Sequence, residues 1–191
     1  MQIIVARYNE DISWIEKLAK SNPSFFIRLY NKGDILEKKT GIYVQNLPNI
    51  GREGDTFLRH IIDNYSYTFE KNVFLQGNPF YHDEEVLAKL DKPTGSLEAL
   101  GSLLVSDKTG GPHHPGLPVM DTYKRIFGKE KETFEFSAGA QWIVPKKNII
   151  NKSISFWRKL YDIYLDTPHG PWVFERLWQD IFLYKEDNEN T

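Results

Sequence analysis

Residues 72–83 constrain the fold of this chain more than any other stretch. Val73, Phe74 and Leu75 form a continuous apolar run, and the polar, turn-forming residues Gln76-Gly77-Asn78-Pro79 follow it directly. An apolar run that ends so abruptly is typical of a short strand buried on both faces. Such strands are found in open α/β sheets, where ligands bind beyond the carboxyl ends of the strands.

The residues after this strand therefore form a candidate ligand site. Gln76, Asn78, His82 and Asp83 follow one another closely and could contact a polar ligand or a metal-bridged phosphate. A purely structural interpretation is also open, in which the strand ends in an Asx-type turn and Asn78 bonds its own backbone. The stretch alone does not separate the two interpretations.

The first 90 residues alternate between apolar runs and apolar residues at helical spacing. This alternation predicts an α/β fold with a nucleotide-binding type of half. In chain order, the strand candidates are residues 3–6, 25–30, 42–44 and 73–75, and the helical periods are residues 12–19 and 53–65.

The pattern is less regular after residue 90. Residues 97–105 are apolar but do not favour helix or strand, and residues 110–118 are too rich in glycine and proline for either. A helix is predicted over Val119 to Phe127 with Gly128 as its C-cap residue. Further strands are predicted at 132–136 and 141–144, and further helices at 153–165 and from Pro171 onward.

We predict one domain, residues 1–191. Its first half (1–90) is of the nucleotide-binding type, and its second half (91–191) recognises a different group, which the residue pattern does not identify. The length suffices to bury a core. With 24 basic and 26 acidic residues, the chain lacks the positive charge that nucleic-acid binding needs. No apolar run is long enough for a membrane span, and no signal peptide is recognisable. The absence of cysteine agrees with a reducing compartment, so we expect a soluble cytoplasmic protein.

Residues 49–55 form a second candidate binding loop. Gly51 and Gly54 enclose Arg52 at the start of a predicted helix, so backbone N–H groups and a guanidinium could approach a phosphate or carboxylate. The alternative is a glycine-punctuated loop in which Arg52 pairs with Glu53 or Asp55. The loop lacks the signature of a P-loop and the spacing of a dinucleotide fingerprint.

Two features of the second half are also candidates for function. The adjacent His113 and His114 lie in the glycine- and proline-rich stretch, which we interpret as a surface loop or a lid. Glu175 falls among the apolar residues of the last predicted helix. A carboxylate in such surroundings is either paired, here with Arg176 or Arg158, or held for catalysis.

The sequence resembles the GT-A glycosyltransferases. Residues 3–10 resemble their opening strand and base-binding loop, and residues 73–78 take the place of their strand that ends in Asp-x-Asp. A small GT-A-like family of fungi and giant viruses, chlorella viruses among them, is resembled more closely, over nearly the whole chain. Four motifs carry this resemblance: Ala-Arg-Tyr-Asn-Glu-Asp (6–11), Gly-Arg-Glu-Gly (51–54), Phe-Leu-Gln-Gly-Asn-Pro (74–79) and Gly-Ala-Gln (139–141).

The resemblance implies a central mixed β-sheet flanked by helices, and transfer of a sugar from a UDP-sugar to a glycan or glycoprotein acceptor. In such enzymes Mn²⁺, or Mg²⁺, bridges the diphosphate and acts as a Lewis acid for the leaving UDP. Gln76 and Asn78 replace both aspartates here, and neutral amides are weaker ligands for a hard cation. A viral member would build capsid-protein glycans in the host cytoplasm, as a monomer or as part of a longer chain.

The resemblance also assigns roles by position. Glu175 is the expected catalytic carboxylate, serving as general base if the reaction inverts the anomeric configuration. The expected nucleotide-binding residues are Ala6, Arg7, Tyr8, Asn9, Arg52, Gln76, Gly77 and Asn78. The expected metal ligands are Asn78 and His169, and the expected sugar- or acceptor-binding residues are Asp83, His114, Gln141 and Trp142.

Two other functions remain open at this level. The missing Asp-x-Asp also fits a non-catalytic module that binds nucleotides or carbohydrates on the same core. A hydrolase could use Asp83, Glu175 and the histidines around a metal ion. The sugar, the acceptor and the stereochemical course do not follow from the sequence.

Overall fold

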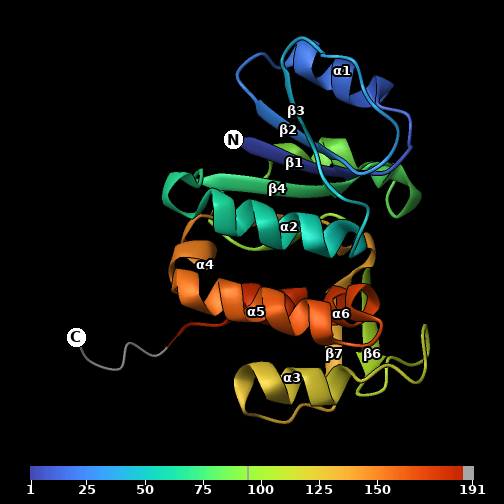
Figure 1. Ribbon diagram of the computed structural model, residues 1–191, viewed down its shortest axis with the longest axis vertical. Coiled ribbons are helices and arrows are strands. Elements are labelled where there is room, and N and C mark those ends of the chain that lie inside the picture. Colours follow the sequence, from blue (N-terminus) through green and yellow to red (C-terminus); the bar gives the residue numbers. More distant parts are fainter. Residues whose placement is uncertain (94, 187–191) are drawn as a thin grey trace.

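A computed structural model describes residues 1–93 and 95–186. Its main feature is a six-stranded mixed sheet with the order β3-β2-β1-β4-β8-β5 (Figure 1). The strands are β1 (Gln2–Arg7), β2 (Phe26–Asn31), β3 (Ile42–Asn46), β4 (Lys71–Gln76), β5 (Glu98–Ala99) and β8 (Trp142–Pro145). This confirms the predicted α/β class and the central mixed sheet flanked by helices.

The first four strands are parallel, so their carboxyl ends meet at one edge of the sheet. β1 lies between β2 and β4, with Ala6 opposite both Tyr30 and Gln76. All six residues of β1 are buried, which agrees with the apolar run at residues 3–6. The polar residues that follow β1 and β4 therefore emerge side by side.

The remaining strands run antiparallel to their neighbours. β8 pairs with β4, and the two-residue β5 pairs with β8 at the sheet edge. A separate antiparallel pair joins β6 (Leu103–Asp107) to β7 (Thr133–Ser137). The ambiguous residues 97–105 thus contribute to two strands that belong to different sheets.

Helices cover both faces of the main sheet. On one face α1 (Ser13–Ser21) packs its buried Ile15 and Ala19 against Val5 and Leu75. On the other face lies α2 (Arg52–Asp63), and a further layer of helices follows it (Figure 1). This layer comprises α4 (Lys147–Ile150), α5 (Ile154–Asp166) and α6 (Gly170–Leu183), with α3 (Val119–Phe127) and the β6–β7 pair beyond it.

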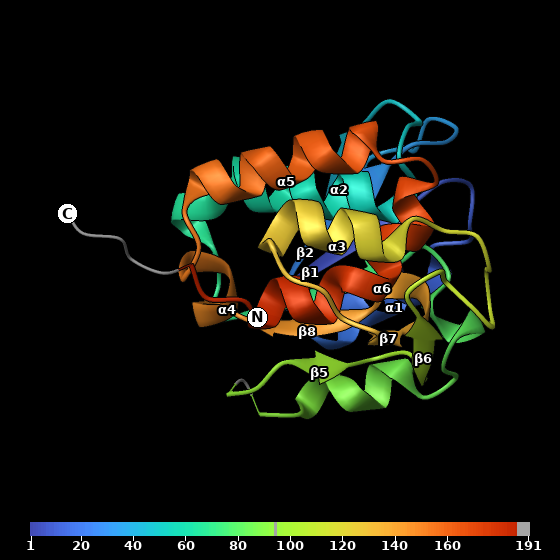
Figure 2. The same ribbon diagram turned by 90° about the horizontal axis from the view of Figure 1, so that it is seen from below.

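The larger core lies between this helical layer and the sheet. Phe57, Phe74, Trp157, Trp178 and Phe182 are all buried within it. Figure 2 shows α5 beside α2, two helices in direct contact, whereas α6 packs against β7. These large aromatic side chains therefore fill the space between the sheet and the stacked helices α2, α5 and α6.

Most predicted elements are present, with some local differences. Short 3-10 turns are present at η1 (Tyr65–Tyr67), η2 (Pro79–Tyr81) and η3 (Val86–Asp91). α3 ends at Gly128 with φ +68°, as predicted. Both sequence halves contribute strands to the main sheet. No helix in the described ranges is long and apolar enough to cross a membrane.

Candidate functional site

A cleft of about 340 Å³ lies at the carboxyl ends of β1 and β4, where α2 begins. It joins the end of the first strand, the entrance of α2 and the end of the central strand. Its lining residues are Ala6, Arg7, Tyr8, Glu10, Lys32, Asn49, Arg52, Glu53 and Gln76. Five residues expected to bind the nucleotide therefore lie together: Ala6, Arg7, Tyr8, Arg52 and Gln76.

Two cations of the cleft are engaged by the protein itself. Arg7 is 8 % exposed and donates from Nε to the Glu10 carbonyl and from Nη1 to Tyr8 O (2.8 Å) and Asn31 Oδ1 (2.5 Å). Lys32 Nζ donates to the carbonyls of Ile50 and Arg52, both at 2.6 Å, and to Asp55 Oδ2 at 2.7 Å. Both side chains hold the loops around the cleft in place.

Arg52 differs from these two cations. Its side chain is 58 % exposed, and its nearest carboxylate, Glu53, lies 3.7 Å from Nε. The guanidinium lies over the ring of Trp172, 5.1 Å from the centroid. The backbone of Arg52 has φ +48°, and α2 begins at this residue without a side-chain cap. Arg52 thus keeps most of its donors available at the entrance of a helix.

Glu10 and Gly77 shape the floor between β1 and β4. Glu10 Oε2 accepts the Tyr8 N–H at 2.7 Å, and a Cβ atom at position 77 would lie 2.5 Å from the same oxygen. Glycine is needed there because the carboxylate occupies the space of a side chain. Gly77 acts through this close approach and is not among the lining residues.

Two other residues expected at the nucleotide lie apart from this lining. Asn9 Oδ1 accepts the backbone N–H of Asp34 at 2.8 Å and lines a different surface hollow. Asn78 is exposed at the start of η2, and its side chain does not cap that turn. The Asx-turn interpretation of Asn78 is therefore not what the structure contains.

Glu175 lies beside the cleft on the first half of α6. Its Oε1 accepts the Gly139 N–H at 2.8 Å, and its Oε2 accepts from Arg176 Nη1 at 2.6 Å. Of the two pairings open from the sequence, Arg176 is the actual partner. Both contacts stabilise the negative charge of the carboxylate, whose side chain keeps 15 % of its surface exposed.

Arg176 connects Glu175 to the glycine- and proline-rich loop. The buried guanidinium also donates to the Trp172 carbonyl and, from Nη2, to His114 Nδ1, each at 2.8 Å. Because arginine is only a donor, Nδ1 must accept, so His114 is neutral in this contact. Burial lowers the pKa of His114, and the positive charge of Arg176 lowers it further. The hydrogen bond from Arg176 to His114 therefore holds the loop against α6.

Trp172 is the residue around which the second half of the site is arranged. The rings of His114 and His169 lie 6.1 and 6.0 Å from it, and Arg52 covers it from α2. In the described part of the chain, the non-glycine residues with positive φ are Arg52, Ala140 and His169. Arg52 and His169 contact Trp172, and Ala140 follows Gly139, whose N–H bonds Glu175. Strained backbone of this kind gathers at functional sites.

Sequence reasoning missed several members of the site. Trp172 falls only within the predicted last helix, and Lys32 gave no recognisable signal. Glu10 was named only within a motif, and Glu53 only as a possible partner of Arg52. Glu53 lines the cleft with its side chain 12 % exposed. Burial raises its pKa above that of an ordinary glutamate, and the nearby charge of Glu175 acts in the same direction.

Three residues expected to bind the sugar or acceptor do not line the cleft. Gln141 is fully buried; its Nε2 donates to Pro79 O at 3.1 Å, and its Oε1 accepts the Gln76 N–H at 3.4 Å. Trp142 is 2 % exposed within the core. Asp83 pairs with Lys89 and accepts the Glu85 N–H. Gln141 holds the end of β4, and Asp83 orders the following turn.

The expected metal ligands, Asn78 and His169, are not accompanied by a cluster of other metal-ligating side chains in the described residues. In residues 1–93 and 95–186, no group of three or more histidine, aspartate or glutamate side chains could hold a metal ion. His169 packs against Trp172, and no hydrogen bond or ring contact links it to Asn78. Hard divalent cations prefer several oxygen ligands, whereas Asn78 and His169 offer one amide oxygen and one ring nitrogen. The expectation of Mn²⁺ or Mg²⁺ held by Asn78 and His169 is not supported by this donor set.

The fold defines an α/β protein with a cleft at the carboxyl ends of parallel strands. Residues 3–108, more than half of the chain, match the family described as "Protein of unknown function (DUF3431)", and the chain belongs to this family. The match includes every lining residue of the cleft but not His114, Trp172 or Glu175. No curated protein and no solved structure matches the chain.

Proposed function

We propose that this protein is a GT-A-like glycosyltransferase that moves a sugar from a UDP-sugar to a glycan or glycoprotein acceptor. One observation carries the proposal. The residues that the resemblance assigns to the nucleotide come from three distant segments, and Tyr8, Arg52 and Gln76 all line the same cleft. Clefts at the carboxyl ends of parallel strands are where such sheets bind nucleotides.

The size and chemistry of the cleft suit a nucleoside diphosphate. Its volume of about 340 Å³ lies within the range of small-molecule sites. Tyr8 is 51 % exposed and offers a ring on which a base can stack. Arg52 presents a planar fork of donors that matches phosphate oxygens. In this arrangement the base lies toward Tyr8 and the diphosphate toward Arg52.

The acceptor would approach from the side of α6. Glu175 uses two of the roughly four lone-pair positions of a carboxylate, so it can still accept a hydroxyl proton. The His114 loop borders the same side through its contact with Arg176. Glu175 is therefore the group in this region that can activate an acceptor hydroxyl.

In an inverting transfer the acceptor oxygen forms the new bond to the anomeric carbon as the bond to UDP breaks. The bonding electron pair leaves with the UDP, and the hydroxyl proton passes to Glu175. In a retaining transfer Glu175 would not serve as this base. The product anomer, determined by NMR, distinguishes the two courses.

The test begins with binding. UDP, ADP, GDP and CDP are compared by isothermal titration calorimetry, each with Mn²⁺ and with EDTA, followed by turnover assays on a panel of UDP-sugars with glycan acceptors. We expect UDP to bind most tightly and one UDP-sugar to be consumed. Absence of UDP binding under both conditions would overturn the proposal.

A second candidate is a non-catalytic module that binds a nucleotide or carbohydrate. The amides Gln76 and Asn78 in place of two aspartates, together with a carboxylate already paired to Arg176, favour it. Such a module would bind UDP in the cleft but release no sugar from any UDP-sugar, with or without acceptor. Calorimetry and the turnover assay together separate it from the enzyme.

A further inference from the structure

The cations of the cleft are not equivalent, and this bears on how a diphosphate would be held. All three donors of the Lys32 ammonium are used by Ile50 O, Arg52 O and Asp55 Oδ2. Arg7 is buried, with Nε and Nη1 engaged. Arg52 is exposed, and no side-chain hydrogen bond occupies its guanidinium within the described chain. The available positive charge of the cleft therefore resides mainly on Arg52.

Arg52 is held in place from two sides. Lys32 Nζ donates to its carbonyl at 2.6 Å and fixes the backbone, which already has a left-handed φ of +48°. The Trp172 ring lies 5.1 Å from its guanidinium carbon and supports the side chain. An exposed arginine that is restrained at both its backbone and its head loses little freedom on binding an anion.

The acidic side of the cleft offers few ligands for a divalent cation. Its carboxylates are Glu10 and Glu53. Glu10 Oε2 is engaged by the Tyr8 N–H and abuts Gly77. Burial favours the neutral form of Glu53, and a neutral carboxyl is a poor metal ligand. No group of three or more acidic or histidine side chains is formed here or elsewhere in the described ranges.

We propose that Arg52 neutralises the diphosphate of a bound UDP-sugar, so that nucleotide binding needs no divalent cation held by the protein. This inference rests on the proposed function and specifies how its donor site works. Trp172 is a positioning residue that acts through Arg52.

The experiment is titration of UDP into the full chain, with EDTA and then with Mn²⁺, for the wild type and three variants. Arg52→Gln removes the charge, and Arg52→Lys keeps the charge but not the planar fork. Arg158→Gln is the matched control, because Arg158 is exposed on α5 and does not line the cleft. Thermal unfolding of each variant establishes that it is folded.

We expect the wild-type Kd in EDTA to lie within about threefold of its value in Mn²⁺. In EDTA, Arg52→Gln should weaken UDP binding about 10- to 100-fold, as loss of a charge-assisted hydrogen-bonding pair does. Arg52→Lys should fall between wild type and glutamine, because an ammonium contacts phosphate only as a point charge. Arg158→Gln should match the wild type.

The outcomes separate this inference from the proposed function. UDP binding that appears only with Mn²⁺ would overturn the inference and leave the glycosyltransferase proposal intact. An unchanged Kd for Arg52→Gln in EDTA would also overturn it. Failure of UDP to bind in either buffer would instead remove the proposed function itself.

Discussion

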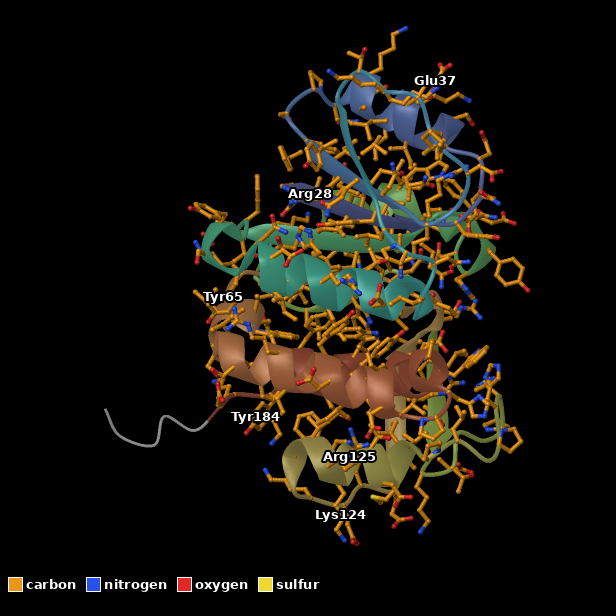
Figure 3. The ribbon with its side chains drawn as sticks, viewed as in Figure 1. Arg28, Glu37, Tyr65, Lys124, Arg125 and Tyr184 are labelled. Carbon is orange, nitrogen blue, oxygen red and sulfur yellow. The ribbon has the colours of Figure 1, made fainter. Side chains whose placement is uncertain are left out.

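Charged side chains at the two ends of the main sheet differ in how far the protein itself satisfies their hydrogen bonds. At the amino ends of the strands, Lys71 Nζ donates to the carbonyls of Leu90 and Lys92, and Lys152 Nζ donates to Asn148 O, Asn151 Oδ1 and Phe182 O. Figure 3 shows Tyr65 and Tyr184 at this end, where the Tyr65 hydroxyl donates to Lys152 O at 2.6 Å. At the carboxyl ends, Arg52 and Glu53 face an open cleft.

This difference distinguishes structural charge from charge available to a ligand. Lys152 is 1 % exposed, and its ammonium is surrounded by acceptors near the end of α6. A buried cation so placed completes the last turn of a helix and leaves nothing for a ligand. Arg52, in contrast, is exposed yet restrained. Burial with satisfied partners identifies scaffold residues, whereas unused donors beside a cleft identify the site.

The largest effect is expected from Glu175→Gln. If Glu175 is the base, its loss should reduce turnover about 100- to 1,000-fold, since a neutral amide cannot accept the proton. UDP affinity should remain within about twofold of the wild type, because Glu175 does not line the nucleotide cleft. Steady-state kinetics and calorimetry on the same sample measure both quantities.

The control for Glu175→Gln is Glu135→Gln, an exposed glutamate on β7 that contacts Gln179. Glu175→Gln also deprives the buried Arg176 of its counter-charge, so a lower melting temperature is expected alongside the kinetic defect. Normal turnover in Glu175→Gln would remove this residue from the mechanism and place it among the scaffold residues.

At the opposite end, Lys152→Met should affect stability alone. It leaves the carbonyls of Asn148 and Phe182 without their shared donor, at a cost of about 2 kcal/mol. For a chain of this length that corresponds to a fall in melting temperature of roughly 4–8 °C. UDP affinity should not change, and a loss of affinity would break the distinction between the two ends.

Lys152 also gives the stability a predictable pH dependence. Burial lowers its pKa to about 7 from the ordinary value of 10.5. Between these two values the unfolded chain binds more protons than the folded one, so the free energy of unfolding should rise with pH over this window. Denaturant titrations at several pH values should show this rise in the wild type and a smaller one in Lys152→Met.

The sequence predicted the elements well wherever local signals agreed. The apolar runs of β1 and β4, the cap at Gly128 and the Pro171 start of α6 each specify structure through neighbouring residues. Residues 97–105 were ambiguous because β5 and β6 pair with the distant strands β8 and β7. Pairing partners far along the chain leave no local pattern.

The site was predictable only in part for the same reason. Tyr8, Arg52 and Gln76 could be placed together because the ends of neighbouring parallel strands must meet. The contact of Arg52 with Trp172 depends on how α6 packs near the start of α2, which no spacing reveals. Gln141 was misplaced because a buried amide can serve the backbone, here the carbonyl of Pro79.

Gly139→Ala tests whether the carboxyl end depends on close packing. Gly139 has φ +73°, and a Cβ atom there would lie 2.3 Å from the His82 ring. The substitution should cost about 1–2 kcal/mol in stability and shift the N–H that Glu175 accepts. Turnover should fall about tenfold while UDP affinity is retained. Gly128→Ala, also at positive φ but with open space around it, is the control for backbone strain alone.

The smallest effect expected is on the pH dependence of donor binding, and it arises from Glu53. Burial raises the pKa of Glu53, so the carboxyl stays neutral at pH values where an ordinary glutamate is ionised. Once ionised, it repels the diphosphate and competes for Arg52, whose Nε lies 3.7 Å away. The affinity for a UDP-sugar, whose diphosphate stays ionised throughout, should therefore fall about threefold as pH rises through the raised pKa of Glu53. Glu53→Gln should bind with a pH-independent Kd close to the low-pH value of the wild type. A wild-type Kd that is already independent of pH would mean that Glu53 is shielded from the ligand and belongs, like Lys152, to the scaffold.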